Sequence, residues 1–291
     1  MAERAAGLGS GASGEGRGDA DGGPAPRPAY RPGHRQEGWD LRFEWGAEGL
    51  AAIADGATAV VVVDVLRFTS AVSVAVGREA VVLPFPWGRG DAARAYAADH
   101  GAELAGRREH GVWSLSPTDL ARLPAGTRLV LPSPNGSALA FAARDGVPGA
   151  RVLAGCLRNA AAVAAVAGAA DGPVAVVAAG ERWHDASGGA LRPSVEDLLG
   201  AGAVLRALVD LAGRPGDSAS PEARCAMAAF DAARADLGGW LARSGSGREL
   251  ASIGFDDDVA TAAVLDAEAV APVLDGPAFS AVVAPAAGHL R

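Results

Sequence analysis

The residues best suited to chemistry in this sequence stand at the ends of short apolar runs. They are acids, amides, hydroxyl groups, one arginine and one glycine: Asp64, Arg67, Ser133, Asn135, Gly136, Ser137, Asn159, Glu196 and Asp197. If the runs are parallel strands, their carboxyl ends meet at one edge of a sheet. Ligands of open α/β sheets bind at such an edge. We therefore expect these side chains to gather around one site.

The mixture of charges predicts a metal-assisted site for a small anion. Helix amino ends at this edge would present free backbone N–H groups, which favour an anion. Carboxylates beside an anion require a cation between them, and oxygen ligands select Mg²⁺. The residues thus predict Mg²⁺ as cofactor and a small phosphorylated or carboxylated molecule as partner.

Several of these residues also have a purely structural interpretation. Asp64 could cap a helix, although a charged residue in a valine run is costly to bury without a partner. Asn135-Gly136 is a common turn sequence. Ser194 and Asp197 have capping-box spacing, so Asp197 is a cap or a metal ligand. The run Asp256-Asp257-Asp258 is typical of a solvated helix start.

Two further residues near the expected edge have open roles. His184 lies in a Gly-rich loop and could be a general acid or have no role. Cys156 is more typical of a buried small residue than of a nucleophile. The three-glycine dinucleotide fingerprint is absent after the run at residues 59–65, which argues against a nicotinamide enzyme.

An alternation of apolar runs and helical patterns positions these residues. The run AVVVVDV at residues 59–65 is typical of a buried strand, and apolar residues then recur at helical spacing up to Gly77. The cycle repeats as far as residue 213; a long helix over 221–243, then a final helix and strand, follow. This predicts an α/β fold with three layers, α/β/α, around a largely parallel or mixed central sheet.

Composition sets the limits of the folded region and of its function. Residues 1–38 hold ten Gly and four Pro but only Leu8 among Leu, Ile, Val and Phe, which predicts a disordered tail and one domain over 39–291. The formal net charge of -8 argues against a nucleic-acid partner. All 26 basic residues are arginine, which excludes lysine Schiff-base chemistry. Two cysteines, Cys156 and Cys225, cannot alone build a disulfide scaffold.

The chain shows no targeting or membrane-spanning pattern. Its first ten residues lack the apolar core of a signal peptide, and the most apolar stretch, 160–180, is broken by Asp171, Gly172 and Pro173. We therefore expect a cytoplasmic protein without a membrane partner, and a homodimer is a candidate assembly.

Taken together, these segments resemble the 2-phosphosulfolactate phosphatase (ComB) family of Mg²⁺-dependent phosphatases over residues 40 to 280. The resemblance rests on VVVVDVLRFTSAV, Ser116-Pro117, SPNGSALA, GCLRNAAAVA and the VVAAG…SVEDLLGAGAV block. It implies an α/β/α phosphatase that acts on the phosphate ester of a small sulfonated or carboxylated acid.

The resemblance carries over to individual positions. Asp64 and Arg67 match the family's Asp-x-Leu-Arg signature, Asn135-Gly136-Ser137 its Asn-Gly-Thr/Ser turn, Asn159 its Leu-x-Asn, and Glu196-Asp197 its paired acids. We accordingly expect Asp64, Glu196 and Asp197 to hold the metal, and Asp64, Arg67 and Asn135 to be catalytic. The expected substrate-binding residues are Arg67, Ser133, Asn135, Gly136, Ser137 and Asn159.

The sequence departs from the family pattern in three places, one of which is a loop from Glu181 to Pro193 that is longer than expected. Arg107-Arg108-Glu109 stands where the family has Gly-Gly-Glu-Arg, so its acid is lost or displaced to Glu109, and Leu115 replaces the asparagine of Asn-Ser-Pro. A lost acid leaves a second hypothesis open, a binding protein or sensor that keeps the anion pocket without turnover. For the enzyme, the nucleophile is either water or Asp64 itself.

Overall fold

A computed structural model describes residues 30–86, 90–106, 113–183 and 189–283. A 3-10 helix at Pro32–Arg35 lies within the predicted tail. The next residue, Gln36, is buried, and its side-chain amide exchanges hydrogen bonds of 2.8 and 3.0 Å with the Phe43 backbone. The predicted boundary at residue 38 therefore falls too late, because Gln36 already pairs with the folded domain; residues 1–29 lie outside the described ranges.

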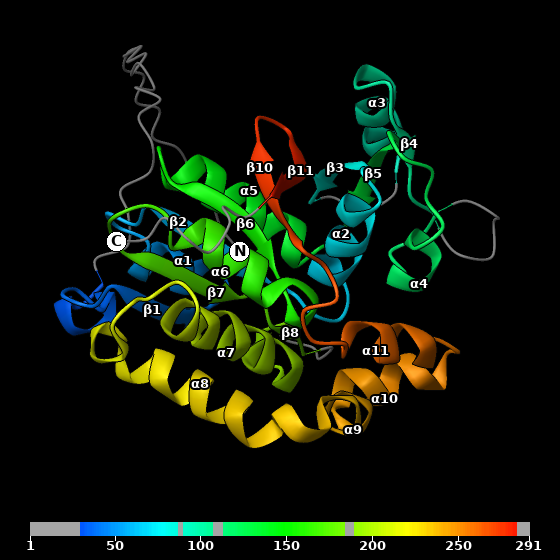
Figure 1. Cartoon of the computed structure of the whole chain (residues 1–291). Helices are drawn as coiled ribbons and strands as arrows, with labels where there is room; N and C mark the ends of the chain where they lie inside the picture. Colours follow the sequence, from blue (N-terminus) through cyan, green and yellow to red (C-terminus); the bar gives the residue numbers. More distant parts are fainter. Residues whose placement is uncertain (1–29, 87–89, 107–112, 184–188, 284–291) are drawn as a thin grey trace, which may run out of the picture.

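Within the described residues, nine strands form one mixed sheet in the order β1-β7-β2-β6-β10-β11-β3-β5-β4 (Figure 1). The strands of this sheet are β1 Leu41–Trp45, β2 Ala59–Val63, β3 Val81–Phe85, β4 Glu103–Leu104, β5 Arg128–Pro132, β6 Arg151–Gly155, β7 Val174–Ala178, β10 Val270–Asp275 and β11 Ala278–Val283. A separate two-stranded ribbon pairs β8 Glu181–Arg182 with β9 Leu191–Arg192.

Helices cover both faces of the sheet. They are α1 Gly46–Ile53, α2 Phe68–Gly77, α3 Asp91–Asp99, α4 Pro117–Leu120, α5 Gly136–Gly146, α6 Ala160–Ala167, α7 Val195–Asp210, α8 Pro221–Ala233, α9 Leu237–Arg243, α10 Gly245–Ser252 and α11 Asp256–Ala262. The prediction of a three-layer α/β/α fold with a mixed sheet is confirmed. No helix in the described part of the chain is long and apolar enough to span a bilayer.

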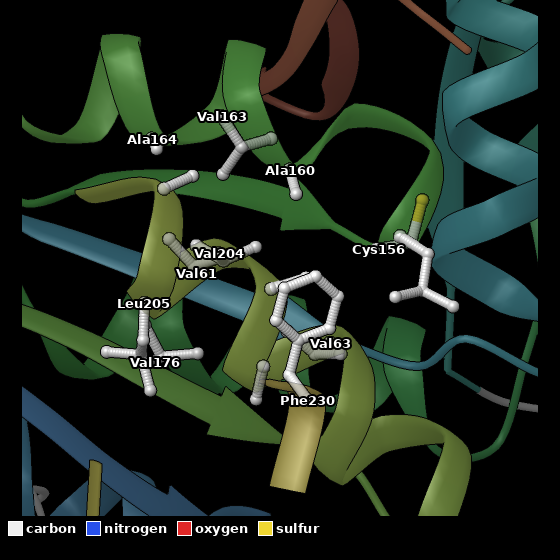
Figure 2. Close-up of a cluster of buried hydrophobic side chains, with 14 of the residues drawn as sticks. Val61, Val63, Cys156, Ala160, Val163, Ala164, Val176, Val204, Leu205 and Phe230 are labelled. Carbon is white, nitrogen blue, oxygen red and sulfur yellow. The ribbon is translucent and has the colours of Figure 1, made fainter. Parts of the chain in front are cut away.

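The valines of β2 show how the layers are held together. All five residues of β2 are buried, and alternate side chains enter opposite cores because successive strand residues face opposite sides. Val61 and Val63 pack with α6, α7 and α8, as Figure 2 shows around Val204 and Phe230. Val60 and Val62 pack on the other face with α1, α2 and α5. This places β2 at the centre of both cores.

The direction of the strands changes within the sheet. β1, β7, β2 and β6 run parallel, but the antiparallel hairpin β10–β11 separates them from β3 and β5, which therefore run the opposite way. The expectation that all carboxyl ends share one edge is thus wrong for β5. The start of α5, which follows β5, still contacts Asp64 at the end of β2, and α5 packs against β3, β6 and β2.

The last third of the chain differs from its prediction. The single helix expected over 221–243 is interrupted by a 3-10 turn at Arg234–Asp236, where the Asp236 side chain accepts the Gly239 N–H at 2.9 Å and starts α9. The final helix and strand are α10, α11 and the β10–β11 hairpin. An N-cap aspartate followed by two low-propensity glycines accounts for the break.

Candidate active site

Asp64 directly follows β2 and lies between the amino ends of two helices. Its side chain is buried, with Oδ1 accepting the backbone N–H of Phe68 at 3.2 Å and Oδ2 that of Gly136 at 2.9 Å. Phe68 begins α2 and Gly136 begins α5, so one carboxylate caps both helices. Each carboxylate oxygen has two lone pairs, which leaves one on each oxygen for another ligand.

The contact between Asp64 and α5 requires a glycine. A Cβ atom on Gly136 would lie 2.4 Å from Cδ1 of Phe68 and 2.6 Å from Oδ2 of Asp64, both closer than atoms can approach. Gly136 is therefore needed for the close approach of α5 to Asp64. Gly136 thus does more than form a turn with Asn135, because it also lets α5 approach Asp64.

Asp197, in the first turn of α7, ties two strand ends together. Its Oδ1 accepts the Val65 N–H at 2.7 Å, and its Oδ2 accepts the Gly180 N–H at 2.9 Å and the Ser194 hydroxyl at 3.0 Å. Ser194 is the N-cap residue of α7, but its hydroxyl donates to Asp197 and does not cap the helix, so the expected capping box does not form. Asp197 thus fixes the segments that carry Asp64 and Glu181.

Two glutamates add negative charge close to Asp64. Glu196 is buried at the start of α7, and half-buried Glu181 begins β8, which two residues separate from the end of β7. Burial raises the pKa of Asp64 to about 6, and the charges of Glu181 and Glu196 contribute to this rise. Burial, with the charges of Asp64 and Glu196, also raises the pKa of Asp197 well above its usual range.

Two arginines that follow strand ends of the site pair with acids other than Asp64. Arg67 pairs with Asp258 at 2.8 Å and Arg158 with Glu268 at 3.1 Å. The strongest charges acting on Asp64 are therefore those of other carboxylates, which is the environment that a bound cation would relieve.

The donor set fits Mg²⁺ in a restricted sense. Among the described residues, no group of three or more His, Cys, Asp or Glu side chains is arranged to hold one metal ion. Mg²⁺ usually binds one or two protein carboxylates and takes its other ligands from water and substrate phosphate. Asp64 and Glu196 meet that requirement, whereas Asp197 keeps a lone pair only on Oδ1, because both lone pairs on Oδ2 already accept hydrogen bonds.

Of the remaining predicted residues after β5, Asn135 contacts one of the site acids, whereas Ser133 and Ser137 are buried. The Asn135 amide donates to Glu181 at 3.1 Å, which brings it to the acids. Ser133 is buried in the loop after β5. The buried Ser137 hydroxyl donates to the Leu131 carbonyl at 3.2 Å, so its proton is used in a hydrogen bond within the protein.

Asn159 has a structural environment. It is fully buried; its Oδ1 accepts the Cys156 N–H at 2.9 Å and its Nδ2 donates to the Ala154 carbonyl at 3.1 Å. Both ends of its amide are thus engaged with the backbone of the turn after β6. Cys156 is also fully buried, and burial raises the pKa of its thiol, as expected of a structural cysteine. His184 and Arg107–Glu109 lie outside the described residues.

Sequence reasoning missed two acids. Glu181 is not among the predicted ligands, although it follows the buried strand β7 after two residues, a position similar to that of Asp64 after β2. Asp258 was interpreted as part of a solvated helix start, yet it is completely buried and contacts Arg67. The neighbouring Asp256 and Asp257 are exposed, as predicted.

A family model described as 2-phosphosulpholactate phosphatase matches residues 49–277 of the chain. The matched region includes Asp64, Gly136, Glu181, Glu196 and Asp197. No curated protein matches the chain.

Proposed function

Because the chain belongs to the 2-phosphosulpholactate phosphatase family of phosphoric monoester hydrolases, we propose that it is a Mg²⁺-dependent phosphatase for a small sulfonated or carboxylated acid. The observation that carries the metal dependence is the buried carboxylate of Asp64 beside two further acids. Such an arrangement is costly without a cation. The proposed location is the cytoplasm, and a homodimer is the proposed assembly to test.

Asp64 and Glu196 would hold Mg²⁺, with Glu181 adding charge at its side. When bound, the cation would neutralise charge that develops on the phosphate oxygens in the transition state. Asp197 serves this arrangement as a positioning residue, because its hydrogen bonds fix Val65 and Gly180 on either side. This proposal moves Asp197 from the expected ligand set to the supporting structure.

The amino end of α5 would bind the phosphate. The Gly136 N–H donates to Asp64, so the N–H groups that follow it in the first turn face the substrate. Asn135 stands at the start of this helix and orients Glu181 through its amide. Asn135 and Ser133 are therefore proposed as neighbours of the phosphate, and Asn159 as a support of the adjoining turn.

Water is the proposed nucleophile. Both oxygens of Asp64 accept backbone N–H groups, which orients the carboxylate for capping and metal binding and leaves it little freedom to attack phosphorus. Acid-quenched enzyme should accordingly carry no phosphate bound to Asp64 during turnover of a ³²P-labelled ester. A stoichiometric acyl phosphate would reverse this assignment.

The decisive experiment is a phosphate-release assay on the purified full chain. Esters of 2-hydroxy-3-sulfo and 2-hydroxy carboxylic acids, and p-nitrophenyl phosphate, would be tested with Mg²⁺ and with EDTA. We expect hydrolysis of the acidic esters that EDTA abolishes and Mg²⁺ restores. Stabilisation by Mg²⁺ and phosphate without release from any ester would favour the binding-protein hypothesis instead.

A further inference from the structure

Asp258 is a fully buried acid that joins three separate parts of the chain. It lies in the first turn of α11 and contacts Arg67 at 2.8 Å. Its other oxygen accepts the Ser116 hydroxyl and, at 3.4 Å, the Thr118 N–H, both at the start of α4. In Figure 1, α11 and α4 lie near each other beside the sheet.

Arg67 is fixed from two directions. Its Nη1 donates to Asp258, and the Phe255 ring lies 4.4 Å from its guanidinium carbon. The side chain still keeps 17% of its surface exposed. Arg67 ends the short loop that begins at Asp64, and its guanidinium is directed towards α11.

A purely stabilising role explains this arrangement poorly. Removing an arginine and an aspartate from water costs free energy that their attraction often fails to recover, and apolar residues would pack as well. An arginine with one nitrogen hydrogen-bonded and part of its side chain exposed is suited to bind an oxyanion such as a carboxylate or a sulfonate, because its other N–H groups keep a set direction.

We infer that Asp258 is a positioning residue that holds Arg67 for an acidic group of the substrate other than the phosphate being removed. This inference rests on the proposed function, since it assigns the second acidic group of the same substrate. In it, Asp64 and the end of α5 serve the phosphate, while Arg67 receives the sulfonate or carboxylate. Phe255 supports the guanidinium from its face.

The test compares ligands with and without that second group. Binding of 3-sulfolactate, the acid without its phosphate, would be measured by calorimetry for the wild type, Asp258→Asn and Asp257→Asn. Asp257 is the exposed neighbour of Asp258 on the same helix and serves as the matched control. We expect Asp258→Asn to raise the Kd about tenfold, as for loss of a charge-assisted hydrogen bond. Asp257→Asn should leave the Kd within about twofold of the wild type, because surface substitutions usually have small effects.

A double-mutant cycle shows whether Asp258 acts through Arg67. Arg67→Lys should weaken 3-sulfolactate binding as well, and Asp258→Asn should add little to that loss if both residues serve one contact. For p-nitrophenyl phosphate, which lacks a second acid, kcat/KM should change by less than about threefold in Asp258→Asn, since the affected contact is not used. If that variant does not fold, Phe255→Leu provides the same selective readout.

Each outcome decides the inference. Equal losses on both ligands, additive losses in the cycle, wild-type binding by Asp258→Asn, or no binding of 3-sulfolactate by the wild type would overturn it. If the wild type binds 3-sulfolactate but hydrolyses no ester, the proposed function fails while the acid-binding role of Arg67 stands.

Discussion

Replacing Asp64 by asparagine tests the metal-site hypothesis most directly. The pKa of Asp64, raised from 3.8 to about 6, means that the ionised side chain costs the metal-free protein about 3 kcal/mol at neutral pH. Asparagine removes that cost. In exchange, its single oxygen serves only one of the two backbone N–H groups, those of Phe68 and Gly136, and the unmet group costs about 1–3 kcal/mol.

These two effects nearly cancel in the metal-free protein. We therefore expect urea unfolding of Asp64→Asn in EDTA to give a free energy of unfolding within about 1–2 kcal/mol of the wild type. Activity, in contrast, should fall by at least about a thousandfold in the phosphate-release assay, because a neutral amide is a poor Mg²⁺ ligand.

The response to Mg²⁺ separates the two roles of Asp64. At a hundredfold excess over its Kd, a bound ion stabilises the folded state by about 2.7 kcal/mol, which raises the Tm of a domain of this size by about 5–10 °C. The wild type and Asp99→Asn, which alters an exposed acid, should show this rise, and Asp64→Asn should not. An equal rise in Asp64→Asn, or near-wild-type turnover at saturating Mg²⁺, would refute the assignment of Asp64 as a ligand.

Three further predictions follow. Because the pKa of Asp64 is raised, its ionisation destabilises the metal-free wild type as the pH rises. Between pH 4 and pH 7 the wild type should therefore lose about 2 kcal/mol of unfolding free energy relative to Asp64→Asn. A difference between the two proteins in urea unfolding that does not change with pH would contradict this. Gly136→Ala should lower kcat/KM at least about tenfold and destabilise by about 1–3 kcal/mol, whereas Gly238→Ala, with open space around its Cβ, should do neither. Asp197→Ala leaves the Val65 and Gly180 N–H groups unmet, and loss of a buried carboxylate with a raised pKa offsets part of that cost, so we expect a destabilisation of about 1–3 kcal/mol, with exposed Asp210→Ala as a near-neutral control in the same denaturation experiment.

Much of the fold was predictable because its central elements have local signals. The β-branched run of β2 and the helical spacing of α2 each determine one element without reference to distant residues. The short strand β1 and the β10–β11 hairpin were not predicted in full. Charged residues interrupt β1, and the hairpin pairs β10 with β6 and β11 with β3, two strands that lie far earlier in the chain. Such pairings have no signature within a short window of sequence.

The candidate site was predictable as far as strand ends identify it. Asp64 directly follows β2, Asn135 follows β5 after two residues, and Glu181 follows β7 in the same way, whereas Glu196 lies at the start of α7 after a longer loop. Asp258 could not be found from strand ends, because its burial depends on α11 packing against α4 and on Arg67 reaching across to it. Its sequence environment, three consecutive acids, is identical in kind for Asp256, Asp257 and Asp258, whereas only Asp258 is turned inward.

The two asparagines of the chain show where motif reasoning ends. Asparagine is so rare here that each one indicates a position where its amide is required. Asn135 directs its amide to Glu181, among the acids of the site, while Asn159 uses its amide to close a buried turn. Both belong to the segments that resemble the family, so a motif marks a constraint on the side chain without stating whether chemistry or folding imposes it. For Asn159 the geometry assigns the constraint to folding: the turn it closes begins at Cys156, whose Cα lies 3.9 Å from a Cβ placed on Gly200 of α7, the helix that carries Glu196 and Asp197.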